Sequence, residues 1–351
     1  MNHERSNMPG SGSVTMGGRT FTFLGPNSAF LNVNMMRNQV MANGTSIRTW
    51  TFGGGFNNDR SVPSPVIEGI EGQLVTVTLD SMMPHSIHLH GLDVDQANDG
   101  VPSTSGFVAQ MAMGGFGRVQ GYTNLGTPFN YAFVAPHAGT YAYHCHVDTV
   151  LHFEMGMYGT VIIRPPDGSA NVAWAGGPSF DKEYIWHLHT FDSSWHVGGM
   201  PVSGPNNVRH RPDYFMINGR DGADTLTDPT TAITAAAGET VLIRTNNMGY
   251  QPALVRLGGL EFQVIASDGR PLPVSVARTE ILVAPGERYD LLFQMPPSTD
   301  QTATVEYFDI RLAGVLGMAS TSIQGGEAEP TIFSDDFESG DLSAWSDVAG
   351  S

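Results

Sequence analysis

The chain has 351 residues, and its 34 acidic side chains outnumber its 17 basic ones, which gives a formal net charge of −17 at pH 7. Nucleic acids and anionic membrane surfaces repel so acidic a chain, so neither is expected as a partner. No apolar run reaches the roughly 18 residues of a membrane-spanning helix, and the one cysteine, Cys145, excludes an intrachain disulfide.

The N-terminal segment is polar and rich in Gly and Ser, so residues 1–20 are expected to form a flexible arm. This segment has no apolar region of the kind that a secretory signal carries. Either the protein is cytoplasmic or a signal peptide has been removed.

Strand-like runs fill the chain from residue 21 onward. Runs such as "QLVTVTL" and "GTVIIRP" are short, rich in β-branched or aromatic residues, and bounded by turn residues, and no helical pattern exceeds about ten residues. One series predicts a β-sandwich over 21–166, a linker is expected over 167–179, and a second series predicts a sandwich over 180–324. The fold class is therefore all-β, with two Greek-key β-sandwich domains. Residues 325–351 contain seven acids and no base, which predicts a disordered acidic tail.

Histidine is concentrated in two short stretches of the first predicted domain, "HSIHLHG" and "HCHVDTVLH". These stretches hold six of the twelve histidines: His85, His88, His90, His144, His146 and His152. A single histidine is more often a surface or core residue than a metal ligand. Two H-x-H pairs with a flanked cysteine in one domain indicate a metal site.

Strand geometry gives the spacing of these residues a meaning. Successive side chains of a strand point to opposite faces, so His144 and His146 share one face and Cys145 points to the other. His88 and His90 share a face in the same way. One strand can thus serve two metal centres, with imidazoles on one side and the sulfur on the other.

The sulfur side needs further ligands, and His85, His152 and Met157 are near enough in the sequence to supply them. Two imidazoles, a thiolate and a weak thioether form a blue-copper electron-transfer site. Zinc is the alternative, but zinc sites favour several cysteines or a bound water, and a thioether is a poor zinc ligand.

These stretches, together with "NDGVPSTSGFVAQ" and "VAPGERYDLL", resemble the multicopper oxidases, the family of laccases and their two-domain relatives. The resemblance covers roughly residues 60–320. It implies two cupredoxin-like Greek-key β-sandwich domains. It also implies copper as the cofactor, at a type 1 site and at a type 2/type 3 cluster.

Position within the family motifs implies a ligand set for each centre. The implied type 1 ligands are His85, Cys145, His152 and Met157, with Met155 as the competing axial candidate. The implied cluster ligands are His88, His90, His144 and His146. Cys145, His144 and His146 are expected to carry the electrons and are therefore the expected catalytic residues.

The sequence departs from the family pattern in the second domain. A trinuclear cluster in this family takes four H-x-H pairs, and the first domain supplies two. His187 and His189, with His196 nearby, lie in the first predicted strand of the second domain and could complete the cluster of a neighbouring subunit. Because two pairs cannot saturate three coppers, a homotrimer is expected.

Other polar and sulfur side chains leave two interpretations open. Asp93, Asp95 and Asp99 follow the "HLH" motif and either relay protons or form turns. The methionine pairs, Met82–Met83 and Met111/Met113 among them, either take up Cu(I) or fill the core.

The expected activity is that of a copper-dependent oxidase. The resemblance implies electron donors such as phenols, aromatic amines or low-valent metal ions, and O2 as the acceptor that is reduced to water. The alternatives are a copper nitrite reductase and a non-enzymatic blue-copper electron-transfer or copper-binding protein. His88 and His146 favour the oxidase, because the reductases have Asp at the first position and no ligand histidine at the second. The use of copper and the usual location of this family indicate a periplasmic or extracellular location.

Overall fold

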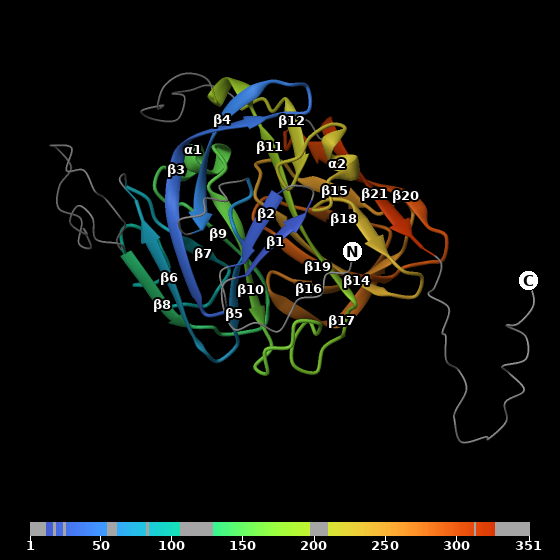
Figure 1. The fold of residues 1–351 in the computed structure, drawn as a ribbon, viewed down its shortest axis with the longest axis horizontal. Coiled ribbons are helices and arrows are strands. Elements are labelled where there is room, and N and C mark those ends of the chain that lie inside the picture. Colours follow the sequence, from blue (N-terminus) through green and yellow to red (C-terminus); the bar gives the residue numbers. More distant parts are fainter. Residues whose placement is uncertain are drawn as a thin grey trace, which may run out of the picture.

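The computed structural model describes residues 12–16, 19–23, 26–54, 62–81, 84–105, 129–196, 210–311 and 314–326. The predicted acidic tail from residue 327 onward, and the pairs Met82–Met83 and Met111/Met113, lie outside this part of the chain. The described residues form two β-sandwiches that pack against each other (Figure 1), which confirms the all-β prediction. Within the described ranges no helix is both long and apolar enough to cross a membrane.

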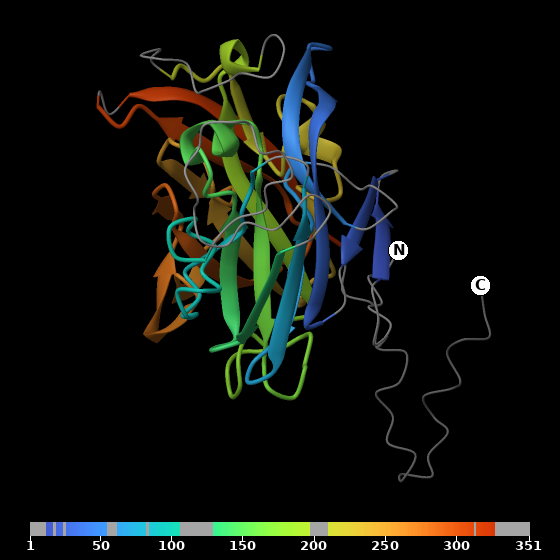
Figure 2. The ribbon, with the colours of Figure 1, turned by 90° about the vertical axis from the view of Figure 1, so that its left-hand side faces the viewer.

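The first sandwich has two four-stranded sheets. The outer sheet has the order β4-β3-β6-β8, with β3 Ser28–Val40, β4 Ser46–Gly54, β6 Leu74–Asp80 and β8 Phe129–Val134. The inner sheet has the order β5-β10-β9-β7, with β5 Ile67–Ile70, β7 His88–His90, β9 Gly139–His144 and β10 Tyr158–Arg164. In Figure 2 the molecule is seen from the side of this sandwich, where the long β3 and β4 run upright. A short helix, α1 Thr149–Glu154, connects β9 to β10.

A two-stranded hairpin precedes this sandwich in the chain. β1 Gly12–Met16 and β2 Arg19–Phe23 pair in antiparallel fashion. The segment expected as a flexible arm, 1–20, therefore includes a paired strand from Gly12 onward.

The second sandwich is built from a six-stranded and a five-stranded sheet. The six-stranded sheet has the order β12-β11-β14-β19-β16-β17, with β11 Lys182–Phe191, β12 Tyr214–Ile217, β14 Thr240–Asn247, β16 Phe262–Ser267, β17 Arg270–Arg278 and β19 Arg288–Gln294. The five-stranded sheet has the order β13-β21-β20-β15-β18, with β13 Ile233–Ala235, β15 Ala253–Arg256, β18 Glu280–Val283, β20 Asp300–Phe308 and β21 Val315–Gly325. Two short helical turns, η1 Ser193–Trp195 and α2 Asp224–Thr227, complete the described elements.

Burial along the strands shows how the layers are stacked. β6, in the outer sheet, alternates between buried and partly exposed residues, as expected for a strand with one solvated face. β9 and β10, in the inner sheet, are buried at every position. One face of these two strands packs on the core of the first sandwich, and the other packs on the six-stranded sheet of the second.

Polar contacts hold this interface together as well as apolar ones. Arg164 on β10 pairs with Glu183 on β11 at 2.7 Å, and the Thr140 hydroxyl on β9 donates to Asp290 on β19 at 2.6 Å. Arg244 donates to the same hydroxyl oxygen at 2.7 Å. An apolar cluster with members from both sandwiches, Tyr158 and Met216 among them, lies beside this network.

Candidate metal centres

A buried group of one thiol and two imidazoles lies at the end of β9. Cys145 Sγ is 3.0 Å from His152 Nδ1 and 3.6 Å from His85 Nδ1. The three ligand atoms lie within 4.8 Å of one another, and all three residues are buried. Two imidazole nitrogens and a sulfur that face one another in a dry pocket are the donor set of a type 1 copper site. We call this set the thiol group.

The segment after β9 brings His152 back toward Cys145. Asp148 adopts a left-handed conformation with φ of 44°, and the chain then turns into α1. The edge of the Trp50 ring packs against the His152 imidazole at 5.2 Å between centroids. Burial lowers the pKa of His152 to about 4 and raises the pKa of Cys145 to about 12. The imidazole is therefore neutral and can bind a metal ion directly, whereas a metal ion must displace the proton of the thiol.

The backbone register separates the two axial candidates. The Cys145 N–H donates to Met157 O at 3.1 Å, which continues the β9–β10 ladder by one residue beyond the pair of His144 and Tyr158. Residues that stand opposite each other in an antiparallel pair share a face. Met157 is thus on the same side of the sheet as the Cys145 thiol. Met155 lies at the end of α1, outside this ladder, although it is also buried.

Four histidines gather on the opposite face of the same sheet. β7 and β9 pair so that His88 stands opposite His144, and ligand atoms of His88, His90 and His144 lie within 4.8 Å of one another. The ring of His146 is 5.3 Å from that of His88 between centroids. We call these four residues the imidazole group. As the alternation of a strand requires, Leu89 and Cys145 point the other way, into the core of the first sandwich.

Hydrogen bonds prepare two of these rings for metal binding. His88 Nδ1 is 2.7 Å from Asp99 O, and His144 Nδ1 is 2.9 Å from Cys145 O. Because a carbonyl oxygen only accepts, each Nδ1 must carry the proton, which leaves each Nε2 as a lone pair for a metal ion. Burial, with Arg288 and His88 nearby, lowers the pKa of His90 to about 4 and keeps that ring neutral.

Only one of the three aspartates considered for proton relay lies beside the imidazole group. Asp99 reaches His88 with its carbonyl and, at 3.3 Å, with a carboxylate oxygen. A glycine allows this approach, since a Cβ at Gly100 would lie 1.8 Å from Ile87 O. Asp95 instead accepts from Ala97 N in a turn, and Asp93 pairs with Arg270.

The second sandwich brings a cation to the imidazole group. A Cβ at Gly91, next to His90, would lie 2.0 Å from Arg288 Nη2, so the guanidinium packs directly against the β7 turn. Among the described residues, no histidine of the second sandwich belongs to a group of three or more close ligand atoms.

The structure does not support the interpretation that His187 and His189 complete the metal cluster of a neighbouring subunit. His187 Nε2 contacts the Thr160 hydroxyl at 2.6 Å, and His189 Nδ1 donates to Met248 O at 2.6 Å. Both side chains are enclosed between the two sandwiches of their own chain, with 2% and 0% exposure. They are therefore unavailable to a neighbouring subunit, because the side chains on β10 cover the strand face on which they lie.

Comparison with known families identifies the family of the chain. A family model described as multicopper oxidase matches residues 32–167, and a second model of the same description matches residues 191–316. The chain belongs to the multicopper oxidase family. The family implies copper cofactors, and the predictions of the family and of two cupredoxin-like sandwiches are confirmed.

Relatives of this multicopper oxidase include a nitrite reductase and laccases. The copper-containing nitrite reductase of Neisseria meningitidis serogroup B is 28% identical over 221 residues, which are 61% of this chain and 47% of the reductase. Laccase-15 of Oryza sativa subsp. japonica is 27% identical over 252 residues, which are 68% of this chain and 38% of the laccase. The matches thus span less than half the length of these curated relatives. The structure of the blue copper oxidase from Nitrosomonas europaea is similar with a TM-score of 0.66 and 25% identity over 85% of each chain.

One functional candidate has no signal in the sequence. The buried carboxylate of Glu154, between His152 and Met157, is contacted by His196 and His210. These partners are 42 and 56 residues further along the chain, so no local spacing could have identified them.

Proposed function

We propose that this multicopper oxidase takes single electrons at a type 1 copper held by the thiol group and reduces O2 to water at the imidazole group. One observation carries the proposal. Cys145 belongs to the thiol group, while the residues on either side of it, His144 and His146, belong to the imidazole group. An electron that arrives at the Cys145 sulfur therefore needs only one residue of backbone to reach the second centre.

A hydrogen bond adds a second connection between the two centres. His144 Nδ1–H donates to the carbonyl of Cys145 at 2.9 Å, so the imidazole is linked to that residue through space as well as along the chain. Met157 supplies the axial thioether in this proposal, because its backbone pairs with Cys145.

Copper bound at the two groups would supply one-electron redox chemistry and a place for O2 to bind. Four electrons from four donor molecules and four protons convert one O2 to two molecules of water. Asp99, which contacts His88, is the carboxylate best placed to pass protons to this centre. The proposed donors are phenols, aromatic amines or low-valent metal ions, and the proposed location is the periplasm or the extracellular space.

A nitrite reductase is the second candidate, and a specific observation favours it. The closest-spaced part of the imidazole group is a set of three rings, from His88, His90 and His144, which suits one copper ion. The reductase from Neisseria meningitidis is also among the relatives of the chain. Against it stands His146, which the reductase would not need, and "QPALVRLGG", where reductases carry a histidine.

A copper count with a visible spectrum distinguishes these functions. We expect four copper ions per chain in a blue, active preparation, because type 1, type 2 and type 3 centres together hold four. Two copper ions per chain would identify the reductase, and one would identify an electron carrier. Either lower count in fully loaded protein contradicts the oxidase.

A homotrimer remains part of the proposal. The imidazole group is only partly buried, and its own second sandwich adds Arg288 rather than further imidazoles, so a larger cluster would need ligands from a neighbouring chain other than His187 and His189. Light scattering on the copper-loaded protein should give three times the mass of the chain. A monomer with full oxidase activity would show that no neighbour is needed.

A further inference from the structure

The helix that carries the predicted type 1 ligand His152 and ends before Met157 cannot be stable by itself. α1 has only six residues, its N-cap Asp148 makes no side-chain capping bond, and no acidic residue stands in its first turn. Isolated helices of this length are unstable in water, so tertiary contacts must hold it. Several of those contacts come from the second sandwich.

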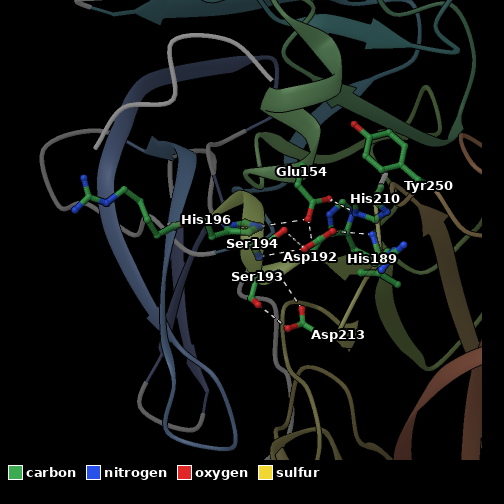
Figure 3. Close-up of polar contacts among 12 residues, drawn as sticks. Glu154, His189, Asp192, Ser193, Ser194, His196, His210, Asp213 and Tyr250 are labelled. Atoms are coloured by element: carbon green, nitrogen blue, oxygen red, sulfur yellow. Dashed lines mark hydrogen bonds and ion pairs between the residues drawn. The ribbon is translucent and has the colours of Figure 1, made fainter. Parts of the chain in front are cut away.

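One of these contacts is made by the carboxylate of Glu154, the last residue of α1. This side chain is fully buried, and its two oxygens are shared among three groups of the second sandwich (Figure 3). The Asp192 N–H donates to Oε1 at 2.5 Å, His196 Nε2 lies 3.4 Å from Oε1, and His210 Nε2 lies 2.9 Å from Oε2.

The partners of Glu154 are themselves fixed. His196 Nδ1 donates to Arg48 O on β4 at 2.6 Å, and His210 Nδ1 contacts Gln251 Nε2 at 3.1 Å. Asp192 accepts from Arg211 N at 2.6 Å, which ties the segment before His196 to the segment after His210. Figure 3 shows Asp192, His196 and His210 around Glu154, beneath α1.

The first turn of α1 is also held by the second sandwich. The hydroxyl of Tyr250 donates to the carbonyl of Val150. Tyr250 also packs at 5.2 Å against the ring of His210, and Trp195 approaches the same ring at 5.5 Å. Both ends of the helix are thus attached to one rigid surface.

A buried carboxylate with polar partners is a poor source of stability. Apolar side chains of similar volume are often equally stabilising or better, whereas polar partners at fixed positions restrict the orientation of the carboxylate. A carboxylate on α1, two residues after His152, is therefore better explained by positioning than by stability. Residues two apart on a helix point to nearly opposite sides. Contacts that fix Glu154 therefore also fix the rotation of α1 about its axis, and with it the direction in which His152 faces Cys145.

We propose that Glu154 is a positioning residue through which the second sandwich orients His152 at the type 1 site. The proposal rests on the proposed role of the thiol group in binding copper. It gives a function to a sandwich whose described residues contain no close metal-ligand group: the second sandwich shapes the copper site of the first. The orienting contact is the set Glu154, His196 and His210.

The test compares Glu154→Leu and Glu154→Gln with Arg244→Met in the full-length protein. Glutamine keeps an oxygen for the Asp192 N–H, whereas leucine keeps none. Arg244→Met breaks a different interdomain contact, the hydrogen bond to the Thr140 hydroxyl on β9, and this contact does not involve α1. It therefore reports what loosening the interface alone does.

In copper-loaded protein, Glu154→Leu should change the reduction potential and the copper hyperfine coupling of the blue site and weaken copper binding roughly 10–100-fold. Glu154→Gln should restore most of these properties, and Arg244→Met should leave them at parental values even where it lowers the melting temperature. Equal changes in Glu154→Leu and Arg244→Met, or none in Glu154→Leu, would overturn the proposal.

A metal-free measurement keeps the orienting contact testable if the parent does not bind copper as a blue site. Alkylation of Cys145 in the folded apo-protein should be roughly tenfold or more faster in Glu154→Leu than in the parent, because losing hydrogen bonds to a charged group frees α1. Arg244→Met should not share this increase. An unchanged alkylation rate in Glu154→Leu would show that Glu154 does not hold α1 in place.

Discussion

Copper-loaded protein with the change Cys145→Ser is expected to be colourless and inactive toward reducing donors. The blue colour of a type 1 site arises from charge transfer between a thiolate and copper, and this chain has a single sulfur that can become an anion. His85 and His152 would remain, but a serine hydroxyl in a dry pocket binds copper far more weakly than a thiolate. The rate of donor oxidation should fall below the detection limit.

The visible spectrum and the rate of donor oxidation, measured side by side, test this expectation. His137→Gln is a suitable control, because His137 is exposed and lies outside both ligand groups. It should stay blue and active. A Cys145→Ser variant that keeps the blue band would end the type 1 assignment.

The double change His144→Ala and His146→Ala is expected to separate the two centres. Its blue band should persist, because the ligands of the thiol group lie on the other face of the sheet and none of them is altered. Oxygen uptake should stop, because electrons that reach Cys145 would have no acceptor centre. In the parent, one O2 should be consumed for every four electrons taken from a phenol, with little peroxide released.

An oxygen electrode with a phenolic donor, run on both proteins and on His137→Ala, measures this directly. Normal oxygen uptake by the double variant would place the acceptor centre elsewhere. Efficient reduction of nitrite by a parent that ignores oxygen would favour the reductase.

The sequence was sufficient to predict that Cys145 and the histidines beside it lie on two opposite faces of the sheet, because strand periodicity is local. Once "YAYHCH" is identified as a strand, Cys145 and its neighbouring histidines must face opposite sides, and β7 obeys the same rule with Leu89 and its two histidines. The structure has this arrangement, and it adds the register that places Met157 beside Cys145.

The sequence could not predict the environments of His187, His189 and Glu154, because these depend on which sheet packs against which strand. His187 and His189 form an H-x-H pair like the others, but only the packing of β11 on β10 shows that Tyr158 and Thr160 enclose them. α1 is too short for a helical period to be recognised. Glu154 has no meaning until distant segments of the second sandwich are brought to it.

The complete burial of β9 and β10 makes the molecule one folding unit with two lobes. A copy of the first lobe alone would expose Tyr158 and Ala142 to water, together with Arg164, which would keep Glu68 but lose Glu183, and so broad an apolar face promotes aggregation. The lobes should therefore melt in one cooperative transition rather than in two. A lineage that carries this arrangement cannot exchange one lobe for a foreign one without rebuilding the layer between them.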